Sequence, residues 1–267
     1  MTNVLDKGFI RLVETMGTDE SVVQAARISY GKGTKSINDD TNLIRYLLKH
    51  KHSTPFEMCE IKLHIKAPIF VVRQWMRHRT ASINEYSARY SEMSDDFYFP
   101  SPDSLQKQSQ VNKQGREGSF SDEESELILS KMQGICNNAY HEYGELLKMG
   151  LSREIARTIL PINIYTEFYW KIDAHNLMHF LKLRSSDHAQ YEIRVYADAI
   201  LAIFADWMPI TYQAFVDYNL KSVTLSRIEL QMLKKSIDQT KLHDIVESSN
   251  ELSKREKFQI KTIYLDN

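Results

Sequence analysis

The sequence predicts an α+β protein, a single mixed domain in which a central sheet is flanked by long helices. Residues 8–17 read as a short strand, and residues 60–67 and 164–171 alternate apolar with polar side chains, as strands with one solvated face do. Residues 121–149 instead repeat apolar side chains at helical spacing over several turns. The order of these elements indicates mixed α and β structure.

Two helices are expected after the first strand. Thr18 is placed to cap a helix over residues 19–29, and a second helix is expected to begin at Asp40 or Thr41. The polar loop of residues 30–40 contains glycines, but their spacing does not match the phosphate-binding pattern GxxxxGK[ST]. We therefore interpret this loop as a connection between helices.

The most highly charged part of the chain follows the strand at residues 60–67. Residues 67–79 are expected to form a helix with Pro68 at its first position, and residues 80–91 an irregular or extended segment. The predicted helix has an apolar and a polar side: Ile69, Val71, Val72, Trp75 and Met76 against Arg73, Gln74, Arg77 and His78. Arg77, His78 and Arg79 are expected to close the helix, where cations suit the negative end of the dipole.

A polar insertion at about residues 100–121 is expected to be an ordered excursion or a lid within one domain. Ser121 and Glu124 then form a capping box that opens a long helix, and Gly150 ends it. The apolar residues of this helix that we expect to pack are Leu127, Ile128, Met132, Ile135, Tyr140, Tyr143 and Leu147.

The remaining elements are predicted from caps and prolines. A short helix carries Arg153 and Arg157 one turn apart. Asp173 can cap a helix over residues 174–184, and a further helix is expected over residues 188–207.

We expect one domain over residues 1–220 and a helical extension of unknown role over residues 221–267. Two capping boxes in the extension, Ser226 with Glu229 and Ser253 with Glu256, predict short charged helices there.

The composition excludes some functions. The net charge is −1, so the chain has no global basic bias of the kind that non-specific nucleic-acid binding requires. No apolar run approaches the roughly 20 residues that span a bilayer, and we expect no membrane association. Cys59 and Cys136 are the only cysteines and have no paired spacing, which favours a reducing, cytoplasmic location.

Arg184 is the least usual residue of the helix over residues 174–184, because it falls among the apolar side chains while His175, His179 and Lys182 share the opposite side. A guanidinium cannot be neutralised in a protein, so at such a place it needs an anionic partner. That partner could be a structural carboxylate or a bound anion.

Two other functions are compatible with single features. His175 and His179, one turn apart with His188 nearby, could bind a metal in a hydrolase, although HNLMH lacks the glutamate of HExxH. The arginine cluster and the 14 tyrosines could bind nucleic acid by charge and base stacking, which the slightly acidic balance opposes. We expect neither a metal nor a nucleic-acid partner.

The segment RHRTASINEYSARYS, residues 77–91, resembles the signature RHR-x-x-S-x-N-E-x-S-x-R of the flavin-dependent thymidylate synthases at every fixed position. LKLRSSDHAQYEIR, residues 181–194, is similar to the second block of that family. The resemblance covers about residues 8–218, and we identify the chain as a member of the family.

The resemblance implies that the fold is that of the family and that the reaction is reductive methylation of dUMP to dTMP. Methylenetetrahydrofolate would donate the carbon, FAD would supply the hydride, and NADPH would reduce the flavin again. It also implies a homotetramer with active sites shared between subunits. The chain has no GxGxxG turn, so side chains and loop amides would hold the flavin.

The resemblance also assigns residues to the site. Arg184 corresponds to the arginine credited with activating the substrate by favouring the uracil ring with N3 deprotonated. The substrate-binding residues would be Gln74, Arg77, Glu85, Ser87, Arg89, Arg157 and Arg184. The flavin-binding residues would be His52, Ser53, Thr54, Glu57, Arg77, His78, Arg79, Glu85, Asp173, His175 and His179.

Two details qualify this assignment. Ser87 has no evident His and carboxylate pair beside it, so we interpret it as a hydrogen-bond donor and not as a nucleophile. Asp173, His175 and His179 replace the asparagine, arginine and asparagine of one common family pattern, so a titrating imidazole stands where that pattern has a permanent cation.

Overall fold

The computed structural model describes residues 1–28, 37–110, 115–250, 252 and 254–264. The chain divides into two compact units, Met1–Lys221 and Ser222–Asn267. The first unit contains the sheet and all the residues of the predicted site.

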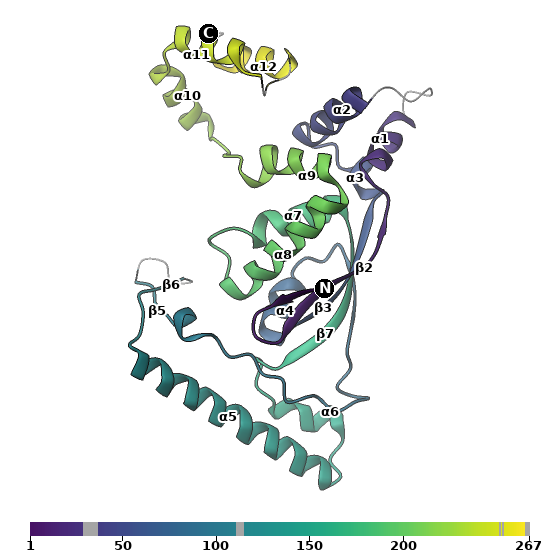
Figure 1. Ribbon diagram of the computed structural model, residues 1–267, viewed down its shortest axis with the longest axis vertical. Helices are drawn as coiled ribbons and strands as arrows, with labels where there is room; N and C mark the ends of the chain where they lie inside the picture. The colour runs from purple at the N-terminus through teal and green to yellow at the C-terminus, as the bar shows by residue number, and fades with distance from the viewer. Residues whose placement is uncertain (29–36, 111–114, 251, 253, 265–267) are drawn as a thin grey trace. The chain divides into compact units, whose positions relative to one another are not determined.

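The first unit is built on a five-stranded antiparallel sheet of order β1-β2-β3-β7-β4 (Figure 1). The strands are β1 Thr2–Val4, β2 Gly8–Met16, β3 Glu60–Pro68, β7 Tyr165–Asp173 and β4 Ser82–Glu85. In register, Leu63 pairs with Trp170 and Glu60 with Asp173. The predicted α+β class is therefore confirmed, with residues far apart in sequence as neighbours in the sheet.

One face of the sheet forms the main core. Ile61, Leu63 and Ile65 are fully buried on β3, as their alternation with polar residues predicts. Helices α4 (Ile69–Trp75), α7 (Ala174–Arg184) and α8 (Tyr191–Trp207) contribute to the same core. The ring of Trp75 lies edge-on to that of Trp170, with centroids 5.3 Å apart. Burial of such large rings gives this layer most of its stability.

The N-terminal helices are α1 (Asp19–Arg27), α2 (Ile37–Lys49) and α3 (Thr54–Glu57). Thr18 caps α1, as predicted, and it does so in a capping box with Ser21 that was not predicted. The expected start of α2 at Asp40 or Thr41 is wrong, because the helix already begins at Ile37 and the Asp40 carboxylate pairs with Arg27 in place of a capping role. Most of the predicted connecting loop, residues 29–36, lies outside the described part of the chain.

The predicted helix of residues 67–79 is shorter than expected. Pro68 is the last residue of β3, where it pairs with Tyr165 in an extended conformation, and α4 ends at Trp75. Arg77, His78 and Arg79 therefore lie in the turn after the helix and not within it. Met76 was expected on the packed face, but it is 40% exposed because it already belongs to this turn.

The insertion contains ordered elements in its described part: η2 (Pro102–Ser104), β5 (Lys107–Gln108) and β6 (Arg116–Glu117), the last two paired antiparallel. Residues 111–114 lie outside the described chain. Helix α5 (Asp122–Lys148) opens on the predicted capping box, in which Ser121 accepts from the backbone of Glu124. The following turn at Gly150 has φ of +91°, which glycine adopts without strain.

The packing expected along α5 is partly wrong. Tyr143 is buried, and with Cys136 it joins a second core that includes Phe97 and Ile164. Leu127 and Ile135, which were expected to pack, are 59% and 66% exposed because α5 touches the rest of the unit along one narrow side only. Helix α6 (Arg153–Ala156) and η3 (Arg157–Ile159) pack on α5.

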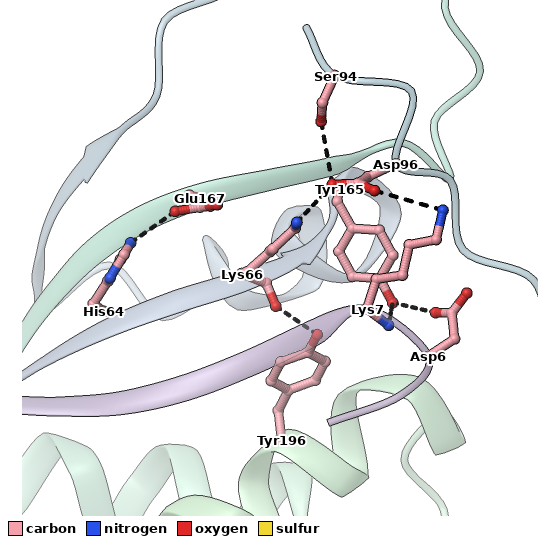
Figure 2. A network of polar contacts seen from close by, with 9 residues as sticks. All are labelled: Asp6, Lys7, His64, Lys66, Ser94, Asp96, Tyr165, Glu167 and Tyr196. Atoms are coloured by element: carbon pink, nitrogen blue, oxygen red, sulfur yellow. Dashed lines mark hydrogen bonds and ion pairs between the residues drawn. The ribbon is translucent and has the colours of Figure 1, made fainter. Parts of the chain in front are cut away.

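A polar network ties the turn between β1 and β2 to the sheet (Figure 2). The Tyr165 hydroxyl donates to Asp6 Oδ1 at 2.5 Å, and Lys66 Nζ donates to Asp96 Oδ2 at 2.7 Å. The hydrogen bond from Lys66 lowers the pKa of Asp96. Tyr196 donates to the Lys66 carbonyl at 2.7 Å, which brings α8 so close to β2 that a Cβ at Gly8 would lie 2.0 Å from the phenol oxygen.

After α8 the first unit ends with α9 (Pro209–Phe215) and a π-helix (Val216–Leu220). The second unit consists of α10 (Arg227–Ser236), α11 (Gln239–Ser248) and α12 (Lys254–Tyr264). The capping box of Ser226 and Glu229 is confirmed, whereas Ser253 of the other predicted box lies outside the described residues. Along the described chain, no helix is both long and apolar enough to cross a membrane.

Candidate active site

A pocket of about 270 Å³ opens between the turn after α4 and the helix α7. Its lining residues are Arg77, His78, Arg79, Thr80, Ile172, Asn176, His179, Leu183 and Arg184. Five of them are predicted site residues, and they come from two sequence blocks about a hundred residues apart. The antiparallel pairing of β3 with β7 joins the blocks, because each strand leads directly into one of the two helices.

Arg184 and His78 form the best-defined contact in the pocket. The Nε–H of Arg184 donates to Nε2 of His78 at 3.0 Å, and Arg184 Nη2 donates to the Gln74 carbonyl at 3.2 Å. An imidazole nitrogen that accepts from a guanidinium carries no proton, so His78 is neutral with its proton on Nδ1. Burial, then the charges of Arg184 and His179, lower the pKa of His78 to about 4.

The charge of Arg184 is not neutralised by a carboxylate anywhere in the described part of the chain. Its side chain is half-buried, and this burial lowers its pKa. The structural Glu or Asp that could have explained this arginine is thus not found among the described residues. With Arg77 and Arg79 beside it, Arg184 makes the pocket a site for an anion.

Several of the residues predicted to bind flavin lie on α7 or on elements that contact it. Helix α3, which carries Thr54 and Glu57, packs against α7. His52 precedes α3 and is exposed beside the ring of Tyr46, 5.9 Å between centroids. His175 is half-exposed on α7, one turn from the pocket residue His179.

Asp173 has a structural task that the resemblance does not imply. One of its oxygens accepts from the backbone N–H of Asn176 at 2.8 Å, and the other accepts from the side-chain amide of Asn176 at 2.7 Å. The predicted N-cap of α7 is therefore confirmed. Both carboxylate oxygens already have partners in this role.

The other predicted substrate residues lie at the far end of β4. This strand starts at Ser82, near the pocket, and ends at Glu85, roughly 10 Å away at about 3.4 Å per residue. Glu85 accepts from the Thr166 hydroxyl at 2.9 Å. Ser87 lies in the turn that follows β4.

Arg89 and Arg157 belong to this second group. Arg89 pairs with Glu154 of α6 at 3.2 Å, with both side chains largely exposed, so this pair contributes little stability. Arg157 is exposed in η3. The structure thus divides these predicted substrate residues of one chain into two groups. The pocket group is Arg77 and Arg184, and the β4-end group is Glu85, Ser87, Arg89 and Arg157.

The sequence analysis missed one set of polar residues beside the pocket. Gln190 donates to Glu192 Oε2 at 2.8 Å and accepts from Gln74 Nε2 at 2.5 Å. A sequence signal for Glu192 existed, because it precedes Tyr196 by one turn on the buried side of α8, where an acid is unusual.

The metal alternative receives no support from the described residues, where no group of three or more His, Cys, Asp and Glu side chains is placed to hold an ion. His179 lies instead in a pocket with Arg77, Arg79 and Arg184, which would repel a metal cation.

Fold and pocket together define an α+β protein with an arginine-lined pocket, which is assembled from two sequence blocks on a helix-covered antiparallel sheet. The chain belongs to the thymidylate synthase complementing protein family (Thy1), whose family model matches residues 11–210.

Relatives and solved structures agree with this membership. The chain is 53% identical over 264 residues to a flavin-dependent thymidylate synthase from Ehrlichia ruminantium (strain Welgevonden), covering 99% of this chain and 88% of the relative. It is 54% identical over 253 residues to one from Wolbachia pipientis wMel, with coverages of 95% and 88%. A crystal structure of the UMP/dUMP methylase PolB from Streptomyces cacaoi bound with 5-Br dUMP matches with a TM-score of 0.75 and 33% identity, over 81% of this chain and 98% of that chain.

Proposed function

We propose that this protein converts dUMP to dTMP by reductive methylation, with methylenetetrahydrofolate as carbon donor, bound FAD and NADPH as reductant. One observation carries the proposal: Arg184 is a half-buried cation without a carboxylate partner in the described chain, and it lies in a pocket with the RHR block. Relatives of more than 50% identity are flavin-dependent thymidylate synthases, and the PolB structure contains a dUMP analogue.

Arg184 would act on the uracil ring. Its guanidinium favours the ring with negative charge on N3 and its flanking carbonyl oxygens, because a fixed cation stabilises such charge without reorganisation. Neutral His78 holds the Nε–H of Arg184 and so leaves the Nη atoms to face the ligand or the Gln74 carbonyl. Arg77 would bind the substrate phosphate, for which its planar fork is suited.

The residues present fit FAD in most positions. The pocket carries Arg77 and Arg79, permanent cations that suit a diphosphate, together with His179, and His175 lies one turn away on α7. The residues that would hold the cofactor are His52, Ser53, Thr54, Glu57, Arg77, His78, Arg79, Glu85, His175 and His179. Asp173 fits less well as a direct contact because both of its oxygens cap α7. When bound, the flavin supplies the hydride that completes the methyl group.

We further propose a homotetramer in which each site combines the pocket of one subunit with the β4-end group of another. The separation of Arg184 from Arg89 and Arg157 within one chain supports this arrangement. The resemblance assigns all three arginines to one small nucleotide, and two subunits could bring them together at it. An apolar surface is also left uncovered in the first unit, at Leu127, Ile135, Met149, Leu151, Ile155, Ile159 and Ile162. Exposed apolar patches of this kind mark protein interfaces.

The activity is assigned to residues 1–220. The family model ends at residue 210, and PolB is covered over 98% of its length by 81% of this chain. The role of the extension and the cytoplasmic location stay predictions.

An anaerobic assay tests the proposal. The purified protein should be yellow or take up added FAD, its oxidised flavin should bleach with NADPH, and dTMP should form only when dUMP and methylenetetrahydrofolate are both present. A colourless protein that fails to take up FAD would overturn the proposed function. So would a flavoprotein that leaves dUMP unchanged under these conditions.

A further inference from the structure

Glu192 is a buried carboxylate at the start of α8, only 3% exposed. A buried charge is costly unless each of its oxygens finds donors. Oε1 accepts from the Tyr98 hydroxyl at 3.1 Å and from Arg116 Nη1 at 3.2 Å, and Oε2 accepts from Gln190 Nε2 at 2.8 Å. Burial, then the Glu192 charge, raise the pKa of Tyr98, so its hydroxyl keeps the proton that it donates.

The insertion provides the countercharge. Arg116 lies on β6, donates also to the Ser104 carbonyl at 3.3 Å, and places its guanidinium over the Tyr191 ring, 5.5 Å from the centroid. Its side chain is one-third exposed, whereas that of Glu192 is 4% exposed. Arg116 is therefore fixed on three sides, and the insertion is attached to α8 at this point.

From Glu192 the network continues to the predicted substrate residue Gln74. The Gln190 amide bridges the two, with its Nε2 on Glu192 and its Oε1 accepting from Gln74 Nε2 at 2.5 Å. Gln74 is joined to the pocket through its carbonyl, which accepts from Arg184. Hydrogen bonds thus run from the insertion to the side chain of Gln74, whose backbone carbonyl contacts Arg184 of the pocket.

The chemistry of the groups sets the direction of this chain. A carboxylate paired with a guanidinium is an acceptor only, so Gln190 must turn its NH₂ group to Glu192. The side-chain carbonyl oxygen of Gln190 then faces Gln74, which must donate to it from its own NH₂ group. The Oε1 atom of Gln74 is left as an acceptor, and the structure gives it no partner among the described residues.

We propose that Glu192, acting through Gln190 and held by Arg116, is a positioning residue that makes Gln74 present a hydrogen-bond acceptor to the nucleotide. The inference rests on the proposed function, because Gln74 is placed at the substrate by resemblance. The ligand group that meets Gln74 must then be a donor. On dUMP this is the 3′-hydroxyl of the sugar, because N3 of the ring is the atom that Arg184 is proposed to favour without its proton.

Two variants interrupt the chain at different points. Gln190→Met keeps the length of the side chain but removes both hydrogen bonds and leaves Glu192 with Arg116 and Tyr98. Glu192→Gln keeps the shape, but Tyr98 and Arg116 still need an acceptor, so its oxygen stays with them and its NH₂ group faces Gln190. Gln190 must then accept with its oxygen and donate to Gln74, so that Gln74 presents its NH₂ group in place of its oxygen. Asp187→Asn is the matched control, since Asp187 is a fully exposed acid of the same segment that pairs with Arg194 and takes no part in these hydrogen bonds.

The expected result is a change in substrate binding and not in turnover. In both variants KM for dUMP should rise about three- to tenfold, the loss of one hydrogen bond. The value of kcat and the flavin content should stay close to those of the parent, because the interaction is made equally in the ground and transition states. The melting temperature of Gln190→Met should fall, because Oε2 of the buried Glu192 loses its donor. Asp187→Asn should behave as the parent does.

Analogue binding identifies the donor. The parent should bind 2′,3′-dideoxyuridine 5′-monophosphate more weakly than dUMP, and this discrimination should shrink in Glu192→Gln. Equal binding of the two nucleotides by the parent would show that Gln74 does not meet the sugar hydroxyl and would overturn the inference.

The inference is also overturned if KM for dUMP is unchanged in Gln190→Met, or if Glu192→Gln discriminates against the dideoxy nucleotide as the parent does. Should Glu192→Gln not fold, the KM and analogue measurements on Gln190→Met decide alone. If the parent itself neither binds nor methylates dUMP, the proposed function fails first, and that failure is visible before any variant is compared.

Discussion

Arg184 and His78, 106 positions apart in sequence, share a hydrogen bond of 3.0 Å in which the guanidinium Nε–H donates to the imidazole Nε2. This contact requires a neutral His78, and the low pKa of that residue agrees with it. The pair thus orients a cation in the pocket without neutralising it. Its loss on protonation gives the first prediction.

Acid should destabilise the flavin-free protein through His78. The pKa of His78 is lowered from 6.5 to about 4 in the folded state, so between these values the unfolded chain binds a proton that the folded chain does not. The stabilising contribution is complete above pH 6.5 and is lost as pH falls toward 4. The melting temperature should therefore fall less steeply over this window in His78→Gln than in the parent. His188→Gln, at an exposed histidine, is the control and should follow the parent. If the melting temperature of His78→Gln falls with pH as steeply as that of the parent, the low pKa of His78 is contradicted.

Arg184→Ala should abolish methylation and leave flavin bound. Removing a preorganised group that stabilises developing charge costs about a hundredfold or more in turnover. The measurement is dTMP formation beside the flavin absorbance of the same preparation. Arg194→Ala serves as control, because this arginine pairs with exposed Asp187 on the same segment. Retention of activity within tenfold in Arg184→Ala would exclude the proposed role.

Ser87→Ala should keep measurable activity. A hydrogen-bond donor contributes roughly 0.5–1.5 kcal/mol, so kcat/KM should fall by about tenfold at most. Ser91→Ala, at an exposed serine of the same segment, should have no effect. Total loss of activity in Ser87→Ala, with dUMP binding intact, would show that the serine is a nucleophile.

FAD should bind more weakly as pH rises if His175 faces the flavin diphosphate. Protonated imidazole attracts phosphate and neutral imidazole does not, so a contact with the diphosphate would weaken when the ring loses its proton. His175→Arg should remove this dependence, because an arginine stays charged throughout. Titrations of FAD between about pH 5.5 and 8.5 provide the measurement, with His243→Arg in the second unit as control. If the FAD affinity of the parent does not change with pH, His175 does not contact the flavin diphosphate.

Mixing two inactive variants should restore activity if each active site is shared between two subunits. Arg184→Ala damages the pocket group and Arg157→Ala the β4-end group, so a mixed assembly contains some sites with both groups intact. With random pairing the mixture should regain about a quarter of the parent activity. Each variant is denatured and refolded alone as a control. No recovery from mixed subunits, with light scattering showing that they associate, would place each site within one chain.

Much of the fold could be read from local patterns. The alternation at residues 60–67 and 164–171 predicted β3 and β7, and Ser121 with Glu124 predicted the start of α5. Such signals depend on neighbours within one turn or one strand. The predicted start of α4 at Pro68 was wrong because Pro68 takes part in the pairing of β3 with β7, and that pairing is invisible in a local pattern.

The sequence by itself determined which residues carry charge for the pocket, since the RHR block and Arg184 stand in recognisable segments. Only the tertiary structure decided that Arg184 meets His78, that Glu192 joins Arg116 to Gln74, and that Arg157 lies apart from the pocket. The physical reason is that strand register and helix packing are set by the burial of the whole core, which adds many weak contacts between distant segments. A polar side chain therefore receives its partner from the way the apolar layers pack.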